Sequence, residues 1–322
     1  MKIAMINGRK LIAAAASLAA ALACGPAMSR SAPSPLPAAV VFAPGTISGP
    51  ASETDAAFSK DGKAVVFARN GMIMVSTLLG ANWSAPRIAP FSGEWNDQQP
   101  TMAPDGSYLV FVSNRPVNAG DAKRPSGNLW RVNRDGEGWG TPVHLPPAVN
   151  RGNSTWAPSI AADGSLYFIE RTSASAPFRI WRSQFRQGQY EAATPLSFGD
   201  PATQDVDPAV APDESFIVFG SMHPGRDHER LFIAFKDGGA WSAPVDLGPA
   251  VNADGATDTN EARLGPDFRT LYFSTDRVTP VAYPRTRAQA EADHARIQAW
   301  DNGNQNIWSI SLAPWLDARK RQ

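Results

Sequence analysis

Six acidic residues stand at matched positions from which their carboxylates could act on one ligand. They precede, by six or eight residues, members of a series of aspartates at positions 61, 105, 163, 213 and 267. The six acids are Glu53, Asp55, Asp97, Asp205, Asp207 and Glu261. A basic residue follows each aspartate of the series by eight or ten positions, namely Arg69, Arg115, Arg171, His223 and Arg277.

Two interpretations of this charge pattern are open. Each basic residue could pair with a nearby acid and brace the fold, as most paired charges do. Alternatively, the acids line a polar pocket that takes a cation, a sugar or a basic segment of a partner. Grouped carboxylates can also cleave a glycosidic bond, so a carbohydrate-active enzyme is the rival to a binding role.

The aspartate series belongs to a unit that is repeated five times. Each unit places Asp-Gly, or a variant of it, directly before a short apolar strand that ends in Phe. The five strands end at Phe67, Phe111, Phe168, Phe219 and Phe273. Asp and Gly tolerate the positive φ that a tight turn needs, so each unit is predicted to open with a hairpin.

Two further strands are predicted in each unit. A third apolar segment covers 72–75, 129–132, 179–182, 231–234 and 307–310. A fourth carries a Trp-x-x-Pro motif beginning at Trp83, Trp139 and Trp241. Four strands in about 50 residues match the dimensions of a propeller blade.

The ends of the repeat array predict how the ring closes. The fifth unit lacks a Trp-x-x-Pro strand, while the array is preceded by an unpaired apolar segment at 38–43. We therefore expect an all-β propeller of four-stranded blades over residues 38–315, closed by the N-terminal strand in the last blade. Five blades are expected, and six stay open as the alternative.

These motifs also resemble a known family. Pro-x-x-x-Pro-Asp-Gly from Pro100, then Phe-x-Ser, and Trp-Ser-x-Pro-Val-x-Leu-Gly from Trp241 look like the TolB-like β-propeller repeat, over about residues 50–312. The resemblance implies a propeller that binds partners in the periplasm. Related propellers serve as sensors or as the non-catalytic half of serine peptidases, so the fold does not define the function. TolB has an extra N-terminal domain for which this chain has no room.

In a propeller the inner strand begins, and the second strand ends, on the face where ligands usually bind. Long connections at 116–127, 222–229 and 279–304 are expected on that face. Alanines near helical spacing at 285–300 predict a short helix there, lying over the channel mouth or simply solvated. Three loop histidines (His223, His228 and His294) lack a familiar ligand spacing, so we expect no metal site.

The sequence lacks the motifs of most classes of enzyme. The chain has no Gly-x-Ser-x-Gly, no phosphate-binding glycine loop and no Cys-x-x-Cys pair, so we expect no cofactor. Its 30 basic and 30 acidic residues give no net charge, which argues against nucleic acid as a partner.

The N-terminus predicts export. Lys2, Arg9 and Lys10 precede an apolar run that ends at Cys24, so residues 1–32 are interpreted as a signal peptide and spacer. Cys24, the single cysteine, is either the lipidated first residue of a lipoprotein or part of a signal removed after Ala23 or Ala27. The expected location is the periplasm, or the outer membrane through a lipid anchor at Cys24.

The sequence thus predicts a non-catalytic binding module for a protein, peptide or glycan partner in the bacterial cell envelope. A glycosidase-like propeller that uses the carboxylates at the channel mouth is the alternative.

Overall fold

The computed structural model describes residues 36–118, 120–123, 127–152, 154–200, 202–222, 228–254 and 258–320. The predicted signal peptide and spacer with Cys24, and the predicted site residue His223, lie outside these ranges.

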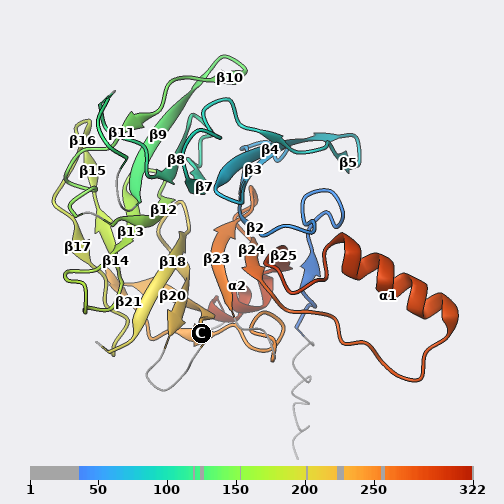
Figure 1. Cartoon of the computed structure of the whole chain (residues 1–322). Helices are drawn as coiled ribbons and strands as arrows, with labels where there is room; N and C mark the ends of the chain where they lie inside the picture. The colour runs from blue at the N-terminus through green and yellow to red at the C-terminus, as the bar shows by residue number, and fades with distance from the viewer. Residues whose placement is uncertain are drawn as a thin grey trace, which may run out of the picture. The chain divides into compact units, whose positions relative to one another are not determined.

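Five antiparallel sheets surround one axis, with the first strand of each sheet innermost (Figure 1). Blade 1 contains β2 (Glu53–Phe58), β3 (Ala64–Arg69), β4 (Met72–Leu79), β5 (Asn82–Trp83) and β6 (Arg87–Ile88). Blade 2 contains β7 (Asp97–Met102), β8 (Tyr108–Ser113), β9 (Asn128–Asp135), β10 (Gly138–Trp139) and β11 (Val143–His144). Blade 3 contains β12 (Trp156–Ile160), β13 (Leu166–Glu170), β14 (Arg179–Ser183), β15 (Phe185–Arg186), β16 (Gln189–Tyr190) and β17 (Thr194–Pro195).

Blade 4 contains β18 (Gln204–Val210), β19 (Phe216–Met222), β20 (Arg230–Asp237), β21 (Ala240–Trp241) and β22 (Val245–Asp246). Blade 5 contains β23 (Thr259–Leu264), β24 (Thr270–Thr275), β25 (Asn306–Ser311) and the N-terminal β1 (Val40–Val41). The inner strands contact one another in the cyclic order β2, β7, β12, β18, β23 and back to β2. The ring is therefore closed with five blades, as predicted.

The N-terminal strand completes the last blade. Val40 and Val41 pair antiparallel with Ser309 and Trp308 of β25. The next residue, Phe42, donates its backbone N–H to the Ile307 carbonyl. This pairing covers the edge that β25 would otherwise expose, which confirms the closure expected from the repeat.

The turn between the first two strands has the same chemistry in all five blades. Each aspartate of the series accepts a hydrogen bond from the backbone N–H two residues later. The residue between them has a left-handed backbone: glycine in blades 1 to 3, but Glu214 (φ +57°) and Phe268 (φ +52°) in blades 4 and 5. The Asp side chain thus fixes the turn even where glycine is absent.

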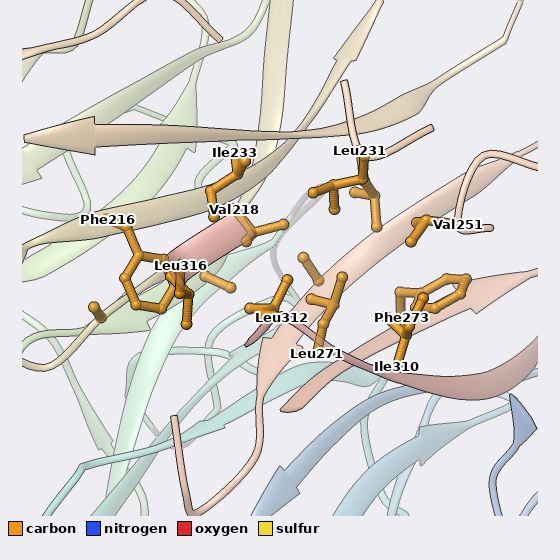
Figure 2. Packing of buried hydrophobic residues seen from close by; sticks show 14 of the residues in the cluster. Phe216, Val218, Leu231, Ile233, Val251, Leu271, Phe273, Ile310, Leu312 and Leu316 are labelled. Atoms are coloured by element: carbon orange, nitrogen blue, oxygen red, sulfur yellow. The ribbon is translucent and has the colours of Figure 1, made fainter. Parts of the chain in front are cut away.

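The core lies between the blades. In Figure 2, Phe216, Val218 and Ile233 of blade 4 face Leu271 and other apolar residues of blade 5 and of α2 (Ala313–Arg319), all in one buried cluster. Similar buried clusters lie between the other neighbouring blades, and this close packing of facing sheets holds the inner strands in a fixed relation.

Two features differ from the expectation. The Trp-x-x-Pro strand is broken in two, since β5 and β6 pair separately with β4 and the prolines interrupt the ladder. The predicted helix exists as α1 (Arg287–Ala299), but it lies to the side of the ring and not over the axis (Figure 1). None of its residues is buried, and Arg296 bonds to Thr279 and Asp301 in its own connection. Neither α1 nor α2 has the length and hydrophobicity of a membrane-spanning helix.

Candidate functional site

One residue in every inner strand adopts a left-handed backbone. These residues stand six positions before the turn aspartate: Asp55, Gln99, Ala157, Asp207 and Glu261, with φ between +49° and +64°. In each blade the pairing with the second strand shifts register at this point, so the strand carries a bulge. A bulge redirects a side chain and a non-glycine residue in this region is strained, two features that are common near functional sites.

The redirected side chains meet on the propeller axis. Gln99 Nε2 donates to Glu261 Oε1 at 2.8 Å, although their blades, 2 and 5, are not neighbours. The other end of the same amide, Gln99 Oε1, accepts from the backbone N–H of Ala157 at 2.8 Å. The backbone N–H of Glu261 donates to Asp207 Oδ2 at 3.3 Å. Contacts between non-adjacent blades are possible only across the axis, so these residues form one axial cluster.

Arg263 is the cation of the axial cluster. Its side chain is 4% exposed, and Nη2 lies 2.7 Å from Asp55 Oδ1 and 3.8 Å from Glu261 Oε2. Its Nε and Nη1 donate to the carbonyls of Pro100 and Ala262. One guanidinium therefore ties blades 5, 1 and 2 together and compensates two carboxylates.

A second acid joins the cluster beside Asp207. Glu229 precedes β20, and its carboxyl group is in hydrogen-bonding contact with Asp207. Two carboxyl groups can bond only when they share a proton. Gly220 in β19 leaves the space that this requires, since a Cβ at Gly220 would collide with the Glu229 carboxyl.

The electrostatics of the cluster favour protonated carboxyls. Burial raises the pKa of Asp207 to about 6, with Arg263 opposing and Asp55 adding to the shift. Burial, followed by the charge of Asp207, raises the pKa of Glu229 well above its ordinary value. Burial, Asp207 and Asp55 raise the pKa of Glu261 in the same direction, against the effect of Arg263. Near neutral pH the cluster therefore holds protons that exposed carboxyls would have lost.

The pair of Asp207 and Glu229 makes stability depend on pH. Both groups ionise near pH 4 in the unfolded chain but keep protons to higher pH in the folded protein. Their stabilising contribution is thus complete below pH 4 and is lost as the pH rises through about 6. Glu229→Gln keeps the shape and removes the ionisation. We expect it to raise the free energy of unfolding by about 1–3 kcal/mol at pH 8 and to change it little at pH 4.5.

Urea unfolding at the two pH values measures this difference. Glu291→Gln on α1, where the side chain is 63% exposed in an i,i+4 pair, is the control and should change stability by less than about 0.5 kcal/mol at both. An equal effect of Glu229→Gln at both pH values would contradict the shared proton.

The acids eight residues before the turns have another role. Glu53 bonds to Arg69 at 2.9 Å and accepts from the Gly49 backbone N–H. Asp97 bonds to Arg115 at 2.8 Å and accepts from Ser92. In both cases the acid is fully buried and anchors the connection that enters the inner strand.

The remaining predicted site residues have other partners. Asp205 accepts from Ser221 and lies 3.8 Å from Arg179. Arg171 donates to the carbonyl of Ala174. Arg277 donates to backbone carbonyls, and its guanidinium lies 3.5 Å from the centre of the Trp308 ring. Of the predicted site residues that the structure describes, only Asp55, Asp207 and Glu261 gather on the axis.

Sequence reasoning missed Arg263 and Glu229. Arg263 stands two residues after the bulge, where the other blades carry small residues: Ala57, Thr101, Ser159 and Ala209. Aligning the five units on their aspartates would have revealed this charge. A weaker signal for Glu229 was Gly220, a glycine inside an otherwise apolar strand.

The space around the axial cluster is small. A cavity of about 50 Å³ touches Arg263 on the side of the Asp-Gly turns, and one of about 120 Å³ touches Glu229. Among the described residues, no three His, Cys, Asp or Glu side chains are grouped as metal ligands would be. Larger grooves lie between the blades: about 600 Å³ between blades 4 and 5, about 570 Å³ between blades 3 and 4, and about 340 Å³ between blades 2 and 3.

Solved structures that are similar to this chain include an enzyme and proteins named TolB. The chain is similar to the endo-arabinase from Bacteroides thetaiotaomicron VPI-5482, with a TM-score of 0.52 and 13% identity over 84% of this chain and 97% of that one. A protein assigned as TolB in Agrobacterium tumefaciens gives a TM-score of 0.48 and 15% identity over 81% and 91% of the two chains. TolB from Acinetobacter baumannii gives 0.38 and 20% identity over 58% of this chain.

This chain spans 41% of that Acinetobacter protein. No model of a known protein family matches the chain, and no curated protein does. At such low identities the similarity shows the β-propeller fold, which is shared by binding proteins and enzymes.

Proposed function

We propose that this protein is a non-catalytic, extracytoplasmic binding module for a protein, peptide or glycan partner in the bacterial cell envelope. The observation that carries the proposal is that the axial carboxylates already bind other groups of the protein. Arg263 holds Asp55 and Glu261, and Gln99 also holds Glu261. Carboxylates that bond to the protein around them serve as struts between blades, and the cavities beside them are smaller than the roughly 300 Å³ of typical ligand pockets.

The inter-blade grooves support binding elsewhere on the ring. With volumes of about 340 to 600 Å³, they fall in the range of ligand pockets. The largest is lined by apolar side chains such as Phe216, Phe235 and Leu316, with Lys236 and Arg319 at its border. Grooves of this kind suit peptide side chains or sugar rings.

Affinity capture tests the proposal. In this experiment residues 36–322 are immobilised and incubated with envelope extract and with envelope glycans of the source bacterium. The immobilised protein should retain a partner reproducibly. Because the axial cluster is a strut in this view, Asp207→Asn should retain the same partner. A purified chain that hydrolysed glycosides and lost that activity with Asp207→Asn would refute the non-catalytic role.

A carbohydrate-active enzyme is the second candidate, and one observation favours it. Asp207, Glu229 and Glu261 have raised pKa values, and a glycosidase needs one protonated carboxyl next to an ionised one. Reducing-sugar release from arabinan, the kind of substrate that the similar endo-arabinase suggests, tests this candidate directly.

Export and anchoring belong to the same proposal. We expect the full chain to lose its N-terminal segment on secretion. Palmitate labelling that disappears with Cys24→Ser would support a lipid anchor, whereas a mature N-terminus after Ala23 or Ala27 without labelling would support a soluble periplasmic protein. Finding the protein only in the cytoplasm would refute export.

A further inference from the structure

The groove between blades 2 and 3 carries polar groups that the fold does not use. Its volume is about 340 Å³, and it lies on the face of the Asp-Gly turns. Tyr108 and Arg131 enter it from blade 2, and Phe185 and Tyr190 enter it from blade 3. The latter two belong to the β15–β16 hairpin, the counterpart in blade 3 of the hairpins that β5, β10 and β21 form with the ends of β4, β9 and β20.

Two tyrosine hydroxyls are available in this groove. Tyr108 is 8% exposed and Tyr190 is partly buried, and neither hydroxyl has a hydrogen-bond partner among the residues that the structure describes. Burial raises the pKa of both phenols. Both hydroxyls therefore remain protonated and can donate to a ligand, where buried tyrosines normally find a partner within the protein.

Arg131 is held in place for the same purpose. Its guanidinium lies 3.7 Å from the centre of the Tyr108 ring, and its Nε donates to Asn133 Oδ1 at 2.7 Å. Within the described part of the chain, Nη1 and Nη2 make no further hydrogen bond. The same register position carries Val75 in blade 1, Ile233 in blade 4 and Ser309 in blade 5. Blade 3 carries Arg182 there, but Arg182 pairs with Glu214 at 2.6 Å, whereas Arg131 has no carboxylate partner among the described residues. A stacked guanidinium with two free nitrogens is an oriented donor.

Acceptors and an aromatic wall complete the set. Asp105 and Asp163 border the groove, and hydrogen bonds from Ser107 lower the pKa of Asp105, so it is ionised. The rings of Phe185 and Tyr190 lie 5.0 Å apart at 59° and form one apolar wall. Gly164 lets this wall approach the turn, because a Cβ there would lie 3.1 Å from Phe185.

We propose that this groove binds a neutral sugar residue of a glycan. Each sugar hydroxyl both donates and accepts, which matches phenol and guanidinium donors next to carboxylate acceptors. The apolar face of a sugar ring packs on aromatic rings. An anion would meet Asp105 and Asp163, and a cation would meet Arg131, so a neutral polyhydroxylated ligand fits best. The inference rests on the proposed binding function and specifies the glycan as its partner.

The first test probes an array of neutral and uronic-acid oligosaccharides with residues 36–322. The neutral oligosaccharide that binds best is then titrated calorimetrically. Tyr108→Phe and Tyr190→Phe keep the packing and remove one donor each, so each should weaken binding about 3- to 10-fold. Arg131→Met should weaken it about tenfold or more. Tyr272→Phe, in the aromatic cluster with Phe42 and Phe58, is the matched control and should bind like the unaltered protein.

Binding of neutral oligosaccharides that all three groove variants weaken would support the inference. The inference would be overturned if the protein bound no neutral sugar or preferred uronic acids. It would also be overturned if none of the three variants changed the binding, or if the protein captured a peptide that the variants released. In the last case the binding function would stand without the sugar, whereas glycoside hydrolysis lost with Asp207→Asn would refute the binding function separately.

Discussion

Arg263→Ala is expected to destabilise the protein by about 3–5 kcal/mol, the largest effect of any single substitution on the axis. The side chain is 4% exposed, and its removal leaves Asp55, which is 1% exposed, without its cation. Glu261 loses the same partner, and the carbonyls of Pro100 and Ala262 lose their donors. A buried charge without compensation costs far more than the ion pair contributes in net stability. Urea unfolding at pH 7 measures the loss.

Two further variants separate this cause from a simple loss of packing. Arg287→Ala removes an exposed i,i+4 pair with Glu291 and should cost less than about 0.5 kcal/mol. Asp55→Asn combined with Arg263→Met removes both charges and fills the space, and should recover about half or more of the loss. A double variant as unstable as Arg263→Ala would mean that the charge balance is not the cause.

Phe42→Ala is expected to cost about 2–4 kcal/mol, because this ring fastens the first blade to the last. Phe42 directly follows β1, and its ring centre lies 5.6 Å from Phe58 and from Trp83 in blade 1 and 5.2 Å from Tyr272 in blade 5. All three pairs meet edge to face, a favourable geometry for aromatic rings. Losing the ring leaves β1 with only its short pairing with β25, while β2 of blade 1 still packs against β23 and β24 of blade 5.

Opening of the ring gives this substitution a second readout. We expect limited proteolysis to remove the N-terminal strand from the Phe42→Ala variant well before it attacks the blades. Leu79→Ala is the control, since Leu79 is 63% exposed and should change neither stability nor cleavage. Uniform cleavage throughout the chain would indicate that β1 and the blades unfold together, against a separate closure step.

Much of the fold could be predicted because the relevant signals are local and repeated. An Asp that accepts a hydrogen bond from the backbone two residues later marks a turn in any protein, as at Asp61 and Asp105. The alternation of side chains in the strand after each turn indicates which residues lie on each face of the sheet. The fifth unit lacks its fourth strand, which indicates that β1 takes that place in the last blade. The pairs of Glu53 with Arg69 and of Asp97 with Arg115 are equally local, since the partners lie on adjacent strands of one blade, and they fit the interpretation that the basic residues brace nearby acids.

The sequence by itself determined the four-stranded blades and their closure by β1, and it favoured five blades over six, because each depends on contacts between neighbouring residues or neighbouring strands. Only the tertiary structure decided which charges meet on the axis: Arg263 reaches Asp55 from a position 208 residues away. It also decided that Gly220 leaves room for the Glu229 carboxyl beside Asp207, and that α1 lies beside the ring. Such contacts depend on the curvature of the whole ring and on bulges that turn single side chains inward, and no spacing within one repeat encodes them.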